Sequence, residues 1–353
     1  MIILICLANK TLKNMSNYFI GLMTGTSADA LDGCIVSFNG KFKLVQALSL
    51  ELEESYKKDY ERSLKNGHKT TKESKKLAKL EKILNKKSID MVNRLVKEAN
   101  LSISDISYIG FSGQTVFHTN EKSYQIGDAR SLAKKTKIKV ISDFRNFDIK
   151  SGGIGAPLIP VFHKYLYSEN NKKKLVFNIG GIANGTFLKG GEISLASDVG
   201  PGNCLLDLVS EIKLNTPFDN NGEEASKGEI NQELLNQLLS NSSHMEYPRA
   251  DDKKDYYKIF DDAFLKINKN SLLRTLSEFT AQKIKDFYDF CNKPDEVIFH
   301  GGGTNNLFLM NLIDSKINSS IKTTDNEIPS KYVEAAGFAY LAYLKKGEIF
   351  EVK

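Results

Sequence analysis

A short turn rich in glycine and hydroxyl side chains is the segment best suited to chemistry. Residues 25–32 read Gly-Thr-Ser-Ala-Asp-Ala-Leu-Asp and separate two apolar runs. At a hairpin tip of this kind, successive backbone N–H groups and hydroxyls point at one spot and can hold an anion. Asp29 and Asp32 would repel a bare phosphate unless a divalent cation stood between them. The turn therefore fits a metal-nucleotide phosphate loop, and this segment alone leaves an ordinary tight hairpin open.

Two further turns carry consecutive glycines. Gly180 and Gly181 would let the main chain approach a ligand closely, and the neighbouring Asn178 could hydrogen-bond phosphate or sugar, although such glycines also form plain turns. Residues 301–303 are all glycine, so no side chain obstructs that turn, which suits an adenine or ribose ring. The turn is not a G-x-G-x-x-G dinucleotide motif, and no G-x-x-x-x-G-K-[ST] sequence is present to form a P-loop.

Two carboxylates are expected at the ends of strands. Asp198 follows one predicted strand and precedes a predicted helix, where it could meet metal-bound waters or a sugar hydroxyl; a helix cap is the alternative. Asp143 follows a strand ending at Ile141, so its carboxylate can emerge at the rim of a cleft. With Arg145 nearby, Asp143 suits a general base acting on water or a hydroxyl, and a structural Asp-Arg pair is the alternative.

Residues 112–118 follow another predicted strand and offer polar side chains that could line a polyol site. His118 and His163 have no metal-ligand spacing, so we interpret them as ordinary, partly buried histidines.

The elements that must position these residues form two similar series. The first has strands at 19–23, 33–38, 42–50, 106–110 and 139–141, a Lys-rich helical region at 53–100 that breaks near 66–67, and a helix at 129–136. The second has strands at 175–179, 185–188, 193–196, 296–299 and 321–323, and helical regions at 203–213, 232–291, 306–317 and 332–345. This repetition predicts two related α/β domains facing each other across a cleft.

Size and composition favour a soluble globular enzyme. The 353 residues can form two domains, and 41% of them are hydrophobic. The net charge is +6, but only six of the 49 basic residues are arginine, and scattered lysine is not typical of nucleic-acid readers. The four cysteines lie far apart, which argues against a zinc site or a disulfide framework and favours a reduced, cytoplasmic setting.

The first residues do not suggest membrane insertion. The apolar run 1–8 is shorter than a membrane span needs, and no basic region precedes it as in a secretory signal. We expect residues 1–15 to be an extension with no role in the core.

Taken together, these segments resemble the anhydro-N-acetylmuramic acid kinases of the acetate kinase, sugar kinase and actin superfamily. The resemblance runs from about Tyr18 to Leu344. Its motifs are GLMTGTSADALDG, GQTVFH, QIGDARSLAKKT, SDFRNFD, GGIGAPLIPVFH, NIGGIAN, GPGN, HGGGTNN and VEAAGFAYLA. It implies two ribonuclease H-like domains of the actin-like ATPase fold, comprising residues 16–128 with 335–353, and residues 129–334.

The resemblance also implies an activity and its site. The enzyme would use ATP and Mg²⁺ to open 1,6-anhydro-N-acetylmuramic acid with water and phosphorylate O6, in cytoplasmic recycling of the cell wall. Asp143 matches the family's base, Gln114 and Glu334 match positions of sugar contacts, and we expect the nearby Arg145 to bind the substrate with them. Asp29 and Asp198 would meet the metal through water. The residues expected to bind ATP are Gly25, Thr26, Ser27, Ala28, Asp29, Ala30, Leu31, Asp32, Asn178, Gly180, Gly181, Gly200, Gly202, Asn203, Gly301, Gly302, Gly303 and Asn305. A homodimer is implied by the resemblance alone.

The chain departs from the family pattern at several positions. Ser112 replaces a usual His, Ala30 a usual Gly, Val199 a usual Thr and Asn305 a usual His. A basic K-S-T-G-R-E-like segment is not recognisable at residues 247–252. Two alternatives therefore stay open: a kinase of the same superfamily acting on another sugar or a carboxylate, and a non-catalytic nucleotide or sugar sensor.

Overall fold

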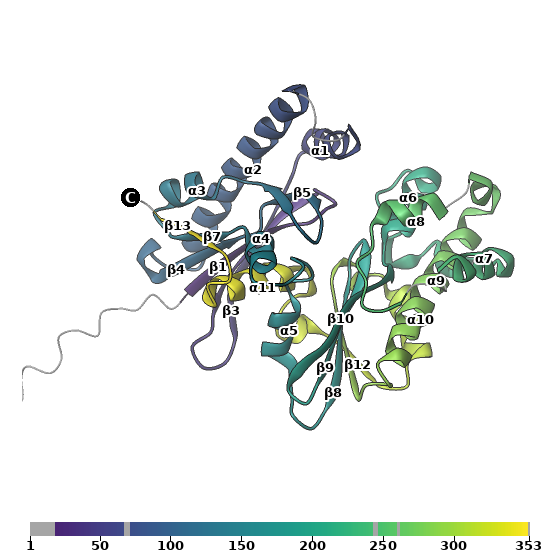
Figure 1. Ribbon diagram of the computed structural model, residues 1–353. Helices are drawn as coiled ribbons and strands as arrows, with labels where there is room; N and C mark the ends of the chain where they lie inside the picture. The colour runs from purple at the N-terminus through teal and green to yellow at the C-terminus, as the bar shows by residue number, and fades with distance from the viewer. Residues whose placement is uncertain (1–17, 67–70, 243–245, 260–261, 352–353) are drawn as a thin grey trace, which may run out of the picture. The chain divides into compact units, whose positions relative to one another are not determined.

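The chain forms two compact units. The computed structural model describes residues 18–66, 71–242, 246–259 and 262–351, so the predicted extension 1–15 lies outside the described residues. One unit comprises the chain up to Leu158 together with Glu334–Lys353, and the other comprises Ile159–Val333 (Figure 1). The chain therefore passes between units at 158/159, later than the predicted 128/129, because a strand at 140–142 still belongs to the first sheet.

The first unit is built on a six-stranded sheet in the order β13-β7-β4-β1-β2-β3. Neighbouring strands β1, β2 and β3 are antiparallel, β4 is parallel to β1, and β7 is parallel to β4. The bounds are β1 Tyr18–Thr24, β2 Ala30–Ser37, β3 Lys43–Glu51, β4 Ile106–Phe111, β7 Val140–Ser142 and β13 Glu348–Phe350. Its other elements are α1 Glu54–Asn66, α2 Thr71–Glu98, α3 Ala129–Thr136, α4 Phe144–Lys150, and a hairpin of β5 Gln114–His118 and β6 Ser123–Ile126.

Two glycines bring helix α11 (Val333–Tyr343) close to the first sheet. Gly21 of β1 is paired with Gly110 of β4. A Cβ atom on Gly21 would lie 1.8 Å from the carbonyl oxygen of Ala335, and one on Gly110 would lie 2.2 Å from that of Phe338. Because any larger side chain would displace the helix backbone, these glycines allow α11 to pack directly against the sheet.

The second unit repeats the strand order with a five-stranded sheet, β10-β9-β8-β11-β12. Strand β9 is antiparallel to β8 and β10, whereas β11 is parallel to β8 and β12. The strands are β8 Lys173–Ile179, β9 Ile182–Lys189, β10 Glu192–Pro201, β11 Glu296–His300 and β12 Ser320–Thr323. The helices are α5 Pro160–Tyr167, α6 Cys204–Leu214, α7 Gln232–Ser242, α8 Lys253–Ile259, α9 Lys269–Phe290 and α10 Leu307–Lys316.

The shared order confirms the predicted fold class. In each unit, three antiparallel strands are followed by two parallel ones joined through helices, which is the ribonuclease H-like arrangement. Each unit also has its own apolar core, with Leu22, Leu31 and Ile109 in the first and Phe177, Phe279 and Phe299 in the second. Among the described residues, no helix has both the length and the apolar character needed to cross a membrane.

Candidate functional site

Asp143 lies where β7 of the first unit ends. It is the residue that precedes α4, and its backbone adopts the left-handed conformation with φ 54° and ψ 37°. Only glycine, asparagine and aspartate enter this region routinely, and other residues held there store strain. The half-buried carboxylate makes no capping hydrogen bond to α4, but its Oδ1 accepts one of 2.6 Å from the side-chain amide of Asn146. The expected position of Asp143 just beyond a strand is therefore observed.

The loop after α4 is held by two side chains of that helix. Arg145 donates a hydrogen bond of 3.0 Å to the carbonyl oxygen of Gly155. Asp148 accepts one of 2.8 Å from the amide of the same residue. Because both groups of Gly155 are engaged, Arg145 is positioned by the loop that follows it, as well as by its own helix.

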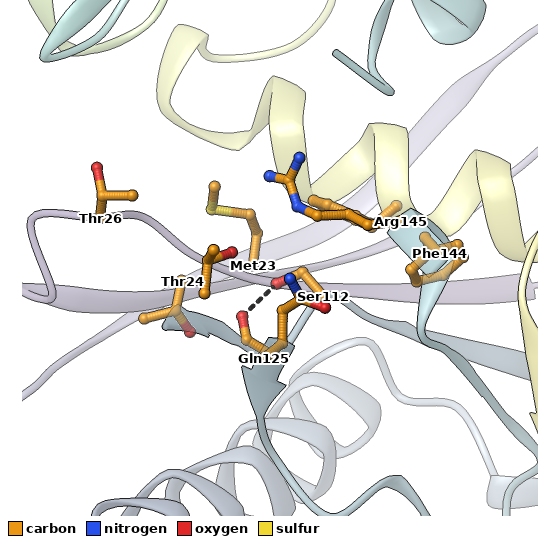
Figure 2. Close-up of a pocket in the computed structure, with 10 residues that line it drawn as sticks. Met23, Thr24, Thr26, Ser112, Gln125, Phe144 and Arg145 are labelled. Atoms are coloured by element: carbon orange, nitrogen blue, oxygen red, sulfur yellow. Dashed lines mark hydrogen bonds between the residues drawn. The ribbon is translucent and has the colours of Figure 1, made fainter. Parts of the chain in front are cut away.

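A cavity of about 50 Å³ lies in the first unit beside Arg145 (Figure 2). Its lining residues come from the end of β1 and the following turn, from the link between β4 and β5, from β5 and β6, from the start of α4 and from the middle of α11. They are Met23, Thr24, Thr26, Ser112, Gly113, Thr115, Gln125, Phe144, Arg145 and Phe338. This volume has room for a few water molecules and is far below the roughly 300 Å³ or more that is typical of a small-molecule pocket.

Glu334, at the start of α11, carries the most unusual carboxyl group of this unit. Burial raises its pKa from 4.5 to about 7, and the nearby Asp32 acts in the same direction, whereas Arg145 lowers it. A carboxyl group with a pKa near neutrality can both donate and accept hydrogen bonds at physiological pH. The structure therefore brings together, within one unit, Glu334 and Arg145, two of the three predicted sugar-contacting residues.

The third such residue, Gln114, is fully buried and contacts the predicted phosphate turn. Its side-chain amide donates a hydrogen bond of 2.8 Å to the carbonyl oxygen of Gly25. In the turn itself, Ser27 donates to the carboxylate of Asp29, which is exposed, and Ala28 has φ 52°. Gln114 thus shapes the turn that joins β1 to β2.

Only part of residues 25–32 forms an open turn. Thr26, Ser27 and Asp29 are exposed, whereas Ala30 and Leu31 are buried within β2. The side chains of Ala30 and Leu31 therefore pack in the core. The groups that the turn offers to an anion are hydroxyls and backbone N–H groups.

The glycine turns of the second unit are tied together at the start of α6. The amide of Gly202 donates a hydrogen bond of 3.0 Å to the carbonyl oxygen of Gly181, and that of Asn203 donates one of 2.8 Å to Gly180. A Cβ on Gly202 would lie 2.3 Å from the carbonyl oxygen of Gly180, so glycine is required there by packing. Gly181 is different, because the nearest atom to its Cβ would be 4.0 Å away.

The turn after β11 likewise contains glycines that close packing requires and one glycine with open surroundings. A Cβ on Gly301 would lie 2.2 Å from the side-chain oxygen of Asn178, and one on Gly303 would lie 2.2 Å from a methyl carbon of Ile179. A Cβ on Gly302 would meet nothing within 4 Å, and Asn305 beyond it is exposed. Gly181 and Gly302 thus leave space that no neighbouring side chain fills, as a turn that receives a ligand requires.

Asp198 does not lie at a strand end, as predicted, because β10 continues to Pro201. Its Oδ2 accepts a hydrogen bond of 2.8 Å from the amide of Asp251, and its own amide donates one of 3.0 Å to Arg249. The predicted strand ends too early because Gly200 and Pro201 suggest a turn, whereas a bulge after Asp198 lets the pairing with β9 continue.

The described residues contain no group of three or more His, Cys, Asp or Glu side chains arranged to hold a metal. Mg²⁺ commonly uses one or two carboxylates together with water and phosphate oxygens. The exposed carboxylate of Asp29 fits such a contact.

Sequence reasoning missed one buried pair in the second unit. His163 is fully buried and not partly buried as predicted; its two ring nitrogens lie 2.9 Å from Thr186 Oγ1 and 2.9 Å from His300 Nε2. Burial lowers the pKa of His300 to about 3 and that of His163 well below 6.5, so both rings are neutral near pH 7. Only the motif containing His300, directly before Gly301, hinted at this contact.

The family model described as "Anhydro-N-acetylmuramic acid kinase" matches residues 17–349. A protein of that name from Shewanella putrefaciens strain CN-32 is 34% identical over 341 residues, which cover 92% of this chain and 91% of the relative. One from Gamma-proteobacterium EBAC31A08 is 33% identical over 337 residues, covering 92% and 91%.

Among solved structures, component A of the (R)-2-hydroxyglutaryl-CoA dehydratase of Acidaminococcus fermentans is similar in fold. The TM-score is 0.50 at 13% sequence identity, and the alignment covers 94% of this chain and 99% of that one. At this identity the likeness concerns the fold alone.

Proposed function

We propose that this chain, which belongs to the anhydro-N-acetylmuramic acid kinase family, opens the anhydro ring of its sugar with water and phosphorylates O6 with ATP. The product would be N-acetylmuramic acid 6-phosphate, an intermediate of peptidoglycan recycling, made in the cytoplasm where ATP is available. The observation that carries the site assignment is Asp143, a half-buried carboxylate with a left-handed backbone at a strand end, close in sequence to the cavity-lining Arg145.

In the proposed reaction, Asp143 accepts a proton from a water molecule whose oxygen attacks C1 of the sugar. The bond between C1 and O6 then breaks, O6 attacks the γ-phosphorus of ATP, and ADP leaves. Each new bond replaces a broken one, and Asp143 releases the proton to solvent after ADP leaves, so no further reactant is needed. General base catalysis of this kind contributes about 10²- to 10⁴-fold to the rate.

Side chains of the first unit would recognise the sugar. Arg145 presents a cation at the cavity, and Glu334, with a pKa of about 7, can offer either a proton or a lone pair to a hydroxyl. Gln114 would act indirectly, by holding the turn at Gly25, because its side-chain amide donates to that turn. Ser112, which replaces the family's usual His, lines the same cavity, so this departure bears on the sugar more than on ATP.

Backbone groups would bind ATP. We assign its phosphates to the hydroxyls and N–H groups of residues 25–29 and to the turns containing Gly181 and Gly202, and its nucleoside to Gly302. Phosphoryl transfer depends mainly on positioning and on neutralisation of charge, which suits such donors. Mg²⁺, held through water by Asp29 and Asp198, would supply the neutralising charge. A homodimer is part of the proposal only through the family resemblance.

The test is an assay of the purified chain with ATP, Mg²⁺ and 1,6-anhydro-N-acetylmuramic acid in water enriched in oxygen-18. We expect stoichiometric ADP and a phosphosugar whose new C1 hydroxyl carries the heavy isotope. N-acetylmuramic acid, which has no anhydro ring, is the control acceptor. ADP formation only with another sugar or a carboxylate would favour the related-kinase alternative, and thermal stabilisation by both ligands without ADP would favour a sensor.

A further inference from the structure

Asn146 lies one helical turn beyond Asp143 and contacts its carboxylate. Its Nδ2 donates to Asp143 Oδ1 over 2.6 Å. We propose that Asn146 is a positioning residue, which holds the carboxylate of Asp143 in the orientation needed for proton transfer. This inference rests on the proposed function, because it concerns the same base.

Asn146 can do this because its own amide is fixed by the β5–β6 hairpin. Its Oδ1 accepts a hydrogen bond of 2.9 Å from the backbone amide of Ser123, and its Nδ2 donates one of 2.9 Å to the carbonyl oxygen of Ser123. Only a side-chain oxygen can accept from the Ser123 N–H, so the orientation of the amide is determined. The two hydrogens on Nδ2 are therefore directed at Ser123 and at Asp143.

The carboxylate needs such a partner because the usual one is missing. An aspartate that precedes a helix commonly accepts hydrogen bonds from the first backbone amides of that helix. Asp143 makes no such bond to α4, since its left-handed backbone turns the side chain elsewhere. With Oδ1 engaged by Asn146, we assign the proton transfer to Oδ2.

Asn85 of helix α2 provides a matched control in the same unit. Its amide bridges the backbone of Asp128 as that of Asn146 bridges Ser123: Oδ1 accepts from the Asp128 amide over 2.9 Å, and Nδ2 donates to its carbonyl oxygen over 3.4 Å. Loss of either asparagine removes the side-chain acceptor of one backbone amide, that of Ser123 or that of Asp128, at a cost of about 1 to 3 kcal/mol in stability. Of the two asparagines, Asn146 also donates a hydrogen bond to the proposed base, Asp143.

The experiment compares Asn146→Ala with Asn85→Ala in the full chain. For Asn146→Ala we expect kcat for the phosphosugar to fall about 10- to 100-fold while KM for ATP changes less than about twofold, because orientation of the base affects the chemical step. Asn85→Ala should lower the melting temperature by a similar amount and leave kcat within about twofold.

A second variant covers the case in which Asn146→Ala does not fold. Asn146→Asp keeps the size of the side chain and its acceptor for Ser123, but it presents an oxygen instead of an N–H to Asp143. We expect it to lose at least as much activity as the alanine variant. Full kcat in a folded Asn146 variant, or equal losses in the Asn85 and Asn146 variants, would overturn the positioning role while the proposed function stood. No turnover by the parent chain would refute both.

Discussion

The two units share a strand order but differ in what their turns expose. In the first unit, the groups available for chemistry are charged side chains, above all Asp143, Arg145 and Glu334. In the second unit, the corresponding turns are glycines such as Gly181 and Gly302, whose surroundings are open. The first unit thus adds charged side chains to its turn at residues 25–29, whereas the second unit presents mainly backbone.

This difference follows the chemistry that each half of the proposed reaction requires. Proton transfer needs a carboxylate of defined orientation, which only a side chain supplies. A triphosphate needs many N–H donors at close range, which a backbone free of side chains supplies. The two units also differ in the pKa shifts that burial causes. Burial raises the pKa of Glu334 in the first unit and lowers the pKa of His300 in the second.

The largest expected effect is that of Asp143→Asn. Asparagine tolerates the left-handed backbone at this position, so the fold should be retained, while the base is lost. We expect phosphosugar formation to fall by about 10³-fold or more, with binding of ATP, measured by calorimetry, within about threefold of the parent value.

Asp148→Asn is the matched control, because Asp148 lies in α4, the helix that begins directly after Asp143, and its carboxylate holds the amide of Gly155. It should cost about tenfold or less in activity, since its effect on the cavity passes through the loop. Equal losses in the two variants would mean that the local negative charge matters and that Asp143 has no distinct role.

Glu334 should make the first unit less stable as pH rises. Its pKa is raised from 4.5 to about 7 in the folded protein, so the neutral form favours folding. The stabilisation is complete below pH 4.5 and is lost as the pH passes through about 7, a change of at most about 3 kcal/mol. Hydrogen exchange of amides in β1 and β4, corrected for intrinsic rates, measures this decline.

Glu334→Gln removes the titrating group and should flatten this dependence between pH 5 and pH 8. The control is Glu98→Gln. Glu98 lies on the exposed surface at the end of α2, where it accepts a hydrogen bond from Gln46 of β3, so this variant should keep the pH dependence of the parent. A parent protein whose first unit is equally stable at both pH values would contradict the raised pKa.

His300 should give the second unit the opposite dependence. Its pKa is lowered from 6.5 to about 3, so the neutral ring favours folding above pH 6.5 and this stabilisation is lost as the pH falls. Between pH 6.5 and about pH 5 the loss amounts to about 2 kcal/mol. Exchange in β8 and β11 should therefore quicken on acidification, and less so in His300→Gln. A second unit that loses protection as pH rises would refute the contrast.

Local patterns predicted most of the fold. Apolar runs bounded by glycine turns indicated the three antiparallel strands of each unit, and the helix at 129–136 was predicted at its observed bounds, because Asp128 caps its first turn. The hairpin β5–β6 and the short helices α4 and α5 were not predicted, since elements of four to eight residues carry little periodicity. The single helical region expected at 232–291 is divided into α7, α8 and α9.

The features of the candidate site that depend on one residue type at one position could be predicted from the sequence. Asp143 after a strand and glycines in turns are visible in the sequence. The partnership of Asn146 with Ser123 and Asp143 depends on a hairpin that the sequence pattern did not reveal, and the contact of His163 with His300 joins residues far apart in the chain. Such contacts follow from tertiary packing, and no local spacing encodes them.

The smallest expected effect concerns the backbone-lined turns of the second unit. Because a Cβ on Gly302 would meet nothing within 4 Å, Gly302→Ala should leave stability within about 0.5 kcal/mol. If this turn receives the nucleoside of ATP, the added methyl group should weaken ATP binding by about tenfold.

Gly202→Ala gives the reverse pattern and so separates packing from binding. Its Cβ would lie 2.3 Å from the carbonyl oxygen of Gly180, so the turn must shift and the unit should lose about 1 to 3 kcal/mol in stability. Calorimetric titration with ATP and thermal unfolding of both variants distinguish the two effects. Unchanged ATP affinity in a stable Gly302→Ala protein would show that this opening does not face the nucleotide, and the contrast between the units would then rest on Gly181 alone.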